Sequence, residues 1–167
     1  MKIFILSLAI LSCITAGAQT PYTSAVNGSS TVLNGIITKY ALINNNNAFP
    51  WYATGSKGYS PDTALVSAMI LSKQKVHFVI FGGTWCEDTQ AILPKFFSVQ
   101  EMTGFPDSRI TFYGVDRSKK TIGGITDAFA ITNVPTIIIM KDGKEAGRVV
   151  EYGKTGKWDS ELAELLK

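Results

Sequence analysis

Residues 76–89 read VHFVIFGGTWCEDT and contain the strongest local signals in the sequence. Val76 to Phe81 is a continuous apolar, β-rich run, which is typical of a central strand covered on both faces. Gly82-Gly83-Thr84 then turns the chain into a helix that begins near Cys86 and continues to about Met102. The sequence therefore predicts a strand that breaks into a helix, with a cysteine at the break.

Cys86 stands where a helix start favours an anion. The first N–H groups of a helix lack partners, and the helix dipole favours negative charge there. Both effects favour the thiolate, which is the nucleophile in disulfide exchange. A buried, inert cysteine is the alternative. We favour the reactive interpretation because a strand-to-helix turn lies at the sheet edge where ligand sites of α/β folds are found.

The segments around this stretch alternate between helical and strand patterns. A helix is expected from Ser60, as N-cap, with Pro61 at its first position, to about Ser72. The later elements are a strand, a short helix, two strands joined by a turn, and a final helix: Arg109 to Val115, Thr121 to Ala130, Thr136 to Met140, Lys144 to Val150 after the turn Asp142-Gly143, and Trp158 to Leu166. The first two strands, each followed by a helical crossover, should make parallel pairs, and the hairpin adds an antiparallel edge. The predicted fold class is α/β, with a small mixed β-sheet flanked by helices.

Residues 1–18 have the pattern of a signal peptide. Lys2 provides the positive start, Ile3 to Leu11 is a short apolar run, and Ala16-Gly17-Ala18 is a small-x-small cleavage site. This run is too short to span a bilayer, and no later stretch is long enough to span one either. We therefore expect an exported protein, periplasmic or secreted, that begins near Gln19. A lipoprotein anchored through Cys13 is the alternative, but the residues before Cys13 match that signal poorly.

Residues 19–58 are expected to lead into the domain. The stretch from Gln19 to Thr31 is rich in Ser, Thr, Asn and Gly and is typical of flexible chain. Apolar residues from Val32 to Ile43 recur at helical spacing and predict an amphipathic helix. An irregular or hairpin segment rich in aromatic residues follows, from Phe49 to Tyr59, and should pack on the domain. The domain itself should span residues 59–167.

Composition excludes several classes of function. The chain of 167 residues has a net charge of +3 with scattered basic residues, which does not provide a nucleic-acid groove. One histidine, His77, and the one cysteine left after cleavage give no credible metal site, and we interpret His77 as structural. The sequence has no phosphate loop and no catalytic triad, so we expect no cofactor.

Several segments together resemble the thioredoxin family. Trp85-Cys86-Glu87-Asp88-Thr89 resembles the Trp-Cys-x-x-Cys motif, and Pro94 matches the proline that kinks the helix after it. Val134-Pro135-Thr136 is similar to the cis-proline loop that faces the active-site sulfur, and Asp142-Gly143-Lys144 to the hairpin that follows. The Trp-Cys-x-Asp-Thr variant is similar to exported thioredoxin-family proteins of Bacteroidetes-type bacteria. The resemblance covers residues 59–167 and implies a thioredoxin-like sandwich with a cis-Pro loop.

The departures from the family pattern bear on the chemistry. Thr89 replaces the second cysteine and cleavage removes Cys13, so Cys86 cannot close an intramolecular disulfide. Ile80 stands where the family has a buried acid, and Phe112 falls near the position of that acid's lysine partner. Cys86 can therefore attack a disulfide, but the chain has no second thiol to release the product.

The motif and the loop suggest a role for each residue. Thr89, three residues on in the helix, can donate a hydrogen bond to the Cys86 thiolate; filling the volume of a cysteine is the equal alternative. Glu87 and Asp88 suit a helix start and are supporting residues, as is Pro94. The resemblance implies a docking surface for an extended substrate made by Trp85, Val134, Pro135 and Thr136.

These residues predict a thiol-disulfide oxidoreductase, or mixed-disulfide former, with a single active-site cysteine in the bacterial envelope. Its partners would be thiol- or disulfide-containing envelope proteins or small thiols, and one of them must supply the resolving thiol. The alternative is a redox-inactive thioredoxin-like protein-binding module, which would not need Cys86. A thiol peroxidase is a third option, supported by the thiol alone.

Overall fold

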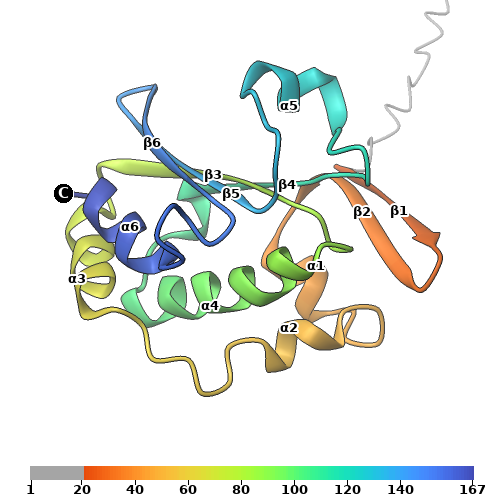
Figure 1. Ribbon diagram of the computed structural model, residues 1–167, viewed down its shortest axis with the longest axis horizontal. Helices are drawn as coiled ribbons and strands as arrows, with labels where there is room; N and C mark the ends of the chain where they lie inside the picture. The colour runs from red at the N-terminus through yellow and green to blue at the C-terminus, as the bar shows by residue number, and fades with distance from the viewer. Residues whose placement is uncertain (1–20) are drawn as a thin grey trace, which may run out of the picture.

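The computed structural model describes residues 21–167 (Figure 1). In chain order the helices and strands are β1 (Tyr22–Asn27), β2 (Ser30–Ile37), α1 (Lys39–Ile43), α2 (Pro50–Thr54), α3 (Thr63–Ser72), β3 (Val76–Gly82), α4 (Glu87–Thr103), β4 (Ile110–Gly114), α5 (Ile125–Ala128), β5 (Thr136–Lys141), β6 (Lys144–Val150) and α6 (Trp158–Leu165), with single 3-10 turns at Asp107–Arg109 and Ile122–Gly124. The expected signal peptide lies outside the described residues. Within residues 21–167, no helix is both long enough and apolar enough to cross a membrane.

The strands form one mixed sheet in the order β1-β2-β4-β3-β5-β6. β3 and β4 are parallel, and the other neighbouring pairs are antiparallel. The sequence predicted a second parallel pair, which does not form. The connection from β4 to β5 begins and ends at the same end of the strands, since Thr136 in β5 lies opposite Phe81 near the end of β3. A connection that enters the sheet at the end where it left reverses the strand direction, so β5 runs antiparallel to β3. The mixed α/β sheet flanked by helices is confirmed.

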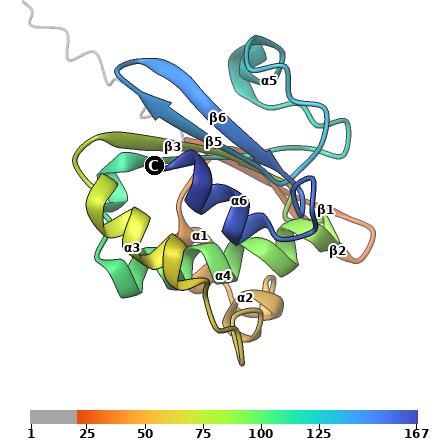
Figure 2. The same ribbon diagram turned by 60° about the vertical axis from the view of Figure 1, so that its left-hand side comes forward.

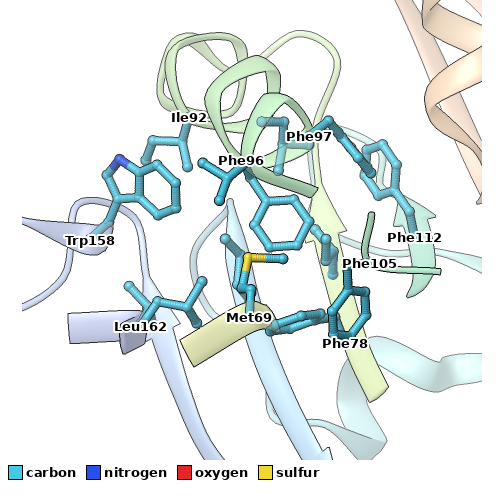
Figure 3. Packing of buried hydrophobic residues seen from close by; sticks show 14 of the residues in the cluster. Met69, Phe78, Ile92, Phe96, Phe97, Phe105, Phe112, Trp158 and Leu162 are labelled. Atoms are coloured by element: carbon cyan, nitrogen blue, oxygen red, sulfur yellow. The ribbon is translucent and has the colours of Figure 1, made fainter. Parts of the chain in front are cut away.

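Two hydrophobic cores lie on the two faces of the sheet. Helices α3, α4 and α6 cover one face, and the short α5 lies over the other (Figures 1 and 2). Along β3, Phe78 and Ile80 belong to the larger core and Val79 and Phe81 to the smaller one, as a strand covered on both faces requires. The larger core is rich in phenylalanine (Figure 3) and includes Met69, Phe78, Ile92, Phe96, Phe97, Phe105, Phe112, Trp158 and Leu162.

The segment before α1 is a β-hairpin, where the sequence predicted flexible chain and then a helix. β1 and β2 pair antiparallel across a turn at Gly28, whose φ is +62°. The helical spacing is therefore misleading for residues 32–37, whose β-branched residues favour a strand once β4 offers an edge. The last part of the predicted helix does form, as α1. Gly35 suits this pairing, since a Cβ there would lie 2.5 Å from the Pro21 carbonyl oxygen.

Asp62, rather than Ser60, caps α3. The Asp62 carboxylate accepts a hydrogen bond of 2.8 Å from the Ala64 N–H, and the helix begins at Thr63. Pro61 therefore precedes the helix instead of occupying its first position. Asp and Ser cap helices about equally well, so the sequence alone did not distinguish the two starts.

The aromatic segment before α3, predicted to be irregular or a hairpin, instead contains the short helix α2, and it packs against α4. Phe49 is buried, and the ring centroid of Tyr52 in α2 lies 6.4 Å from that of Phe97 in α4. Pro94, inside α4, faces the same segment, because a Cβ added to Gly55 would lie 2.7 Å from its Cγ. Residues 49–55 therefore pack with α4 in the larger core.

Candidate functional site

Cys86 is the N-cap residue of α4 and directly follows the turn from β3. Its backbone is extended (φ −90°, ψ 125°), and its N–H donates to the Gly83 carbonyl oxygen at 2.9 Å. Its side chain is half-buried, and the thiol donates a hydrogen bond of 3.2 Å to the carbonyl oxygen of Val134. Cys86 is the one cysteine among residues 21–167. The sulfur thus lies at the start of α4 and contacts the backbone of the loop before β5.

The Val134–Pro135 loop brings a second element to the sulfur. The peptide bond between these residues is cis, and the loop leads into β5. The Pro135 carbonyl oxygen accepts the Glu151 N–H at 2.7 Å, which ties the loop to the end of β6. Thr136 is 1% exposed and its hydroxyl donates to the Asn133 carbonyl oxygen at 2.7 Å, so its side chain holds the loop from inside.

Thr89 is fully buried, and its hydroxyl bonds to the backbone of the turn before α4 and not to the Cys86 sulfur. Its Oγ1 accepts the Gly83 N–H at 3.2 Å, and in the described part of the chain no hydrogen bond joins it to Cys86. The expected Thr89–Cys86 hydrogen bond is therefore replaced by one to the loop backbone. The cause is packing, since the Thr89 methyl group lies against Gly82, where an added Cβ would come within 3.0 Å. The volume-filling interpretation fits this geometry.

Trp85 lies beside the sulfur and is fixed by three neighbours. Its indole N–H donates to the Val115 carbonyl oxygen at 3.0 Å. Its ring covers Gly83, where an added Cβ would lie 2.7 Å from the indole atoms. The Arg117 guanidinium lies 5.4 Å from the ring centroid, within reach of a cation–π interaction. Trp85 therefore offers a half-exposed apolar surface next to Cys86.

Acidic residues and a tyrosine border the sulfur. Glu87 and Asp88 occupy the first turn of α4, as expected for a helix start. Burial, and then the nearby Asp88 carboxylate, hold the pKa of Tyr152 above its ordinary value. Tyr152, just after β6, therefore lies close to this group. Neither Tyr152 nor Arg117 was predicted from the sequence, because each becomes part of the site only through loop packing.

Ile80 and Phe112 are register partners in the parallel pair β3–β4. Both side chains belong to the larger core and are almost completely buried. Because an apolar pair occupies both neighbouring positions, the interior beneath the motif carries no ionisable group there. His77 lies at the opposite end of β3, where its Nε2 is 2.8 Å from the Thr111 hydroxyl. Within residues 21–167, no cluster of three or more His, Cys, Asp or Glu could hold a metal ion.

Known proteins that resemble this chain include thioredoxins. The thioredoxin family model matches residues 63–164, more than half of the chain. Over 96 residues the chain is 29% identical to a thioredoxin of Mycoplasmopsis pulmonis (strain UAB CTIP), covering 57% of this chain and 88% of that protein. Among solved structures, it is similar to a protein of unknown function from Pseudomonas aeruginosa, with 14% identity and a TM-score of 0.52 over 75% of this chain and 87% of that one. The reduced thioredoxin pre-protein of Schistosoma mansoni is 26% identical, with a TM-score of 0.41 over 64% and 94%. The chain belongs to the thioredoxin family.

Proposed function

We propose that the protein is a thiol-disulfide oxidoreductase that acts through Cys86 alone and forms mixed disulfides with its partners. The single thiol of residues 21–167 is half-exposed at the start of α4 and contacts the backbone of the Val134–Pro135 loop. A thiol kept only for packing would be expected inside one of the two cores instead.

The proposed reaction has two steps. In the first, the Cys86 thiolate attacks a partner disulfide; a bond forms between Cys86 and one partner sulfur, and the other sulfur leaves as a thiolate that takes a proton from water. In the second, the thiolate of a small thiol or of another protein attacks the mixed disulfide. The partner sulfur then leaves Cys86 in a new disulfide with that thiol, and the Cys86 thiolate is regenerated.

The residues behind Cys86 support a single-thiol route. Thr89 occupies the position of a resolving cysteine, is buried, and bonds to the loop backbone. Ile80 and Phe112 place two apolar side chains beneath the motif, so neither position offers a base that could take the proton of a resolving thiol. The second step therefore depends on an external thiol.

The surroundings of the sulfur suit an extended polypeptide. Trp85 provides a flat apolar contact on one side. On the other side, the Val134 backbone lies at the entry to β5, where an extended segment can pair with it in β fashion. The side chains of Val134 and Thr136 are buried, so the pairing uses main-chain groups.

We further propose that the protein works in the bacterial envelope. The support is the signal-peptide pattern of residues 1–18, which directs export and leaves Cys86 as the one cysteine of the mature chain. Disulfides persist in such oxidising compartments, so potential partners exist there. Export is tested by the N-terminal mass of protein from its native host, which should begin near Gln19; a lipid-modified Cys13 would contradict it.

Intact-mass spectrometry after incubation with a disulfide-bonded peptide tests the proposed function. The wild-type protein should gain the mass of one peptide chain, localised to Cys86, and lose it when a small thiol is added. Cys86→Ser is the matched control and should gain nothing. If the wild type binds the peptide without forming an adduct, the protein is a binding module and the redox proposal fails.

A further inference from the structure

Thr84 is a buried polar residue in the turn between β3 and α4, and it has no role in the proposed reaction. It is 2% exposed. Its hydroxyl donates to the Thr31 carbonyl oxygen at 2.7 Å and accepts the Leu33 N–H at 3.2 Å. Both partners are backbone groups of β2, so this one side chain joins the turn between β3 and α4 to the N-terminal hairpin β1–β2.

The hydroxyl of Thr84 bonds to the part of β2 that lies beyond its pairing with β4. The pairing of β2 with β4 ends at Gly35, opposite Gly114, although β2 extends back to Ser30. Beyond Gly114, the Thr31 carbonyl and the Leu33 N–H have no strand partner on that side, and buried backbone groups require one. The Thr84 hydroxyl, which both donates and accepts, satisfies both groups.

Thr84 is also tied to the first turn of α4. Its carbonyl oxygen accepts a hydrogen bond of 2.8 Å from the Gln90 side-chain amide. The Gln90 backbone N–H in turn donates to the Cys86 carbonyl oxygen at 3.0 Å. Hydrogen bonds therefore connect the hairpin to Thr84, Thr84 to Gln90, and Gln90 to Cys86. The hairpin lies beside the start of α4 (Figure 1).

We propose that Thr84 is the positioning residue that holds the Cys86 thiol at the Val134 carbonyl by fixing the turn between β3 and α4 to β2. The N-terminal hairpin thereby becomes a part of the active site. The effect on disulfide exchange rests on the proposed function, whereas the coupling between hairpin and thiol does not. A valine at position 84 keeps the shape of threonine but can neither donate nor accept, and a serine keeps both abilities.

The test compares Thr84→Val with Thr84→Ser and with Thr103→Val as a matched control. Thr103 is also a buried threonine, and its hydroxyl donates to the Val99 carbonyl oxygen at 2.8 Å, but it lies at the far end of α4. The readout is the rate at which Cys86 forms a mixed disulfide with a peptide disulfide. Thr84→Val should lower this rate about tenfold, since small misplacements of a reacting group carry large penalties. Thr84→Ser should restore it to within about twofold, and Thr103→Val should match the wild type.

Equal rates for the two valine variants, or a serine variant as slow as Thr84→Val, would overturn the proposal. A measurement on the wild-type chain decides the matter if Thr84→Val does not fold. Alkylation of Cys86 should speed hydrogen exchange of the Leu33 amide, because coupling between the two ends is reciprocal; unchanged Leu33 exchange would refute the coupling. If no variant forms a mixed disulfide, the proposed function fails, and the Leu33 amide still decides the role of Thr84.

Discussion

The Cys86 thiol donates a hydrogen bond of 3.2 Å to the carbonyl oxygen of Val134, a residue 48 positions later in the chain. The contact joins the start of α4 to the cis-bonded loop before β5. A sulfur in a mixed disulfide carries no proton and cannot make this bond. The Val134 carbonyl then becomes free to accept an N–H from an extended partner held at the same sulfur.

Thr89→Cys should create Cys-x-x-Cys spacing at the start of α4 and allow an intramolecular disulfide with Cys86. Thiol titration after mild oxidation should then find no free thiol, and insulin reduction should become measurable but poor. The activity should stay poor because Ile80 and Phe112 leave no ionisable pair beneath the motif. Thr89→Val, which fills the same volume, is the control and should gain no activity. Two free thiols after oxidation would contradict the placement of residue 89 beside Cys86.

Lys39→Met should destabilise the fold without affecting the thiol. The Lys39 side chain is 6% exposed, and its ammonium lies 2.7 Å from the Gln100 amide oxygen and 2.9 Å from a Glu101 carboxylate oxygen. Removing it leaves the Gln100 amide oxygen, which is buried, without its charged partner, and we expect urea titration to show a loss of about 2 kcal/mol in the free energy of unfolding.

Lys120→Met is the control for this prediction. Lys120 pairs with Asp127 on an exposed surface, and an exposed ion pair of this kind contributes less than about 1 kcal/mol. Because Lys39 contacts the last turns of α4, remote from Cys86, neither variant should alter the alkylation rate of the thiol. A Lys39→Met protein as stable as Lys120→Met would show that the buried network contributes nothing.

The stability of the protein should fall as the pH drops through the ordinary pKa of histidine. Burial, and then the positive charge of Arg109, hold the pKa of His77 below its usual value. Below about pH 6.5 the unfolded chain therefore binds more protons at His77 than the folded chain does. The stabilising contribution is complete above that pH and is lost below it.

His77→Gln should flatten this dependence, measured by urea titration at intervals between about pH 5 and pH 7. Glutamine keeps a polar group within reach of the Thr111 hydroxyl, which lies 2.8 Å from His77 Nε2. An unchanged slope in this variant would mean that other groups determine the pH dependence.

Strong local signals made much of the central fold predictable. The side chains of the apolar run from Val76 to Phe81 are buried on both faces of a strand that lies between two cores. Asp142-Gly143 marks the hairpin turn between β5 and β6. Cys86 was placed correctly at the start of α4 because the strand ends in glycines. These elements depend on residues close together in the sequence.

The hairpin β1–β2 and the details of the site depended on distant contacts. Residues 32–37 become a strand because β4 offers an edge more than 70 positions later. Thr89 bonds to Gly83 rather than to Cys86 because its methyl group packs against Gly82. Tyr152 and Arg117 reach the site on loops, whose paths follow from packing and not from periodicity.

The single-thiol mechanism can be tested by counting the partner thiols released per protein molecule in the absence of any other thiol. The protein would be mixed with an excess of a disulfide-bonded peptide, and released thiol and covalent adduct would be measured together. A single-thiol mechanism predicts one thiol released and one peptide attached to Cys86 per protein, after which the reaction stops until an external thiol is added. Release of further thiols without that addition, or no adduct at Cys86, would contradict it.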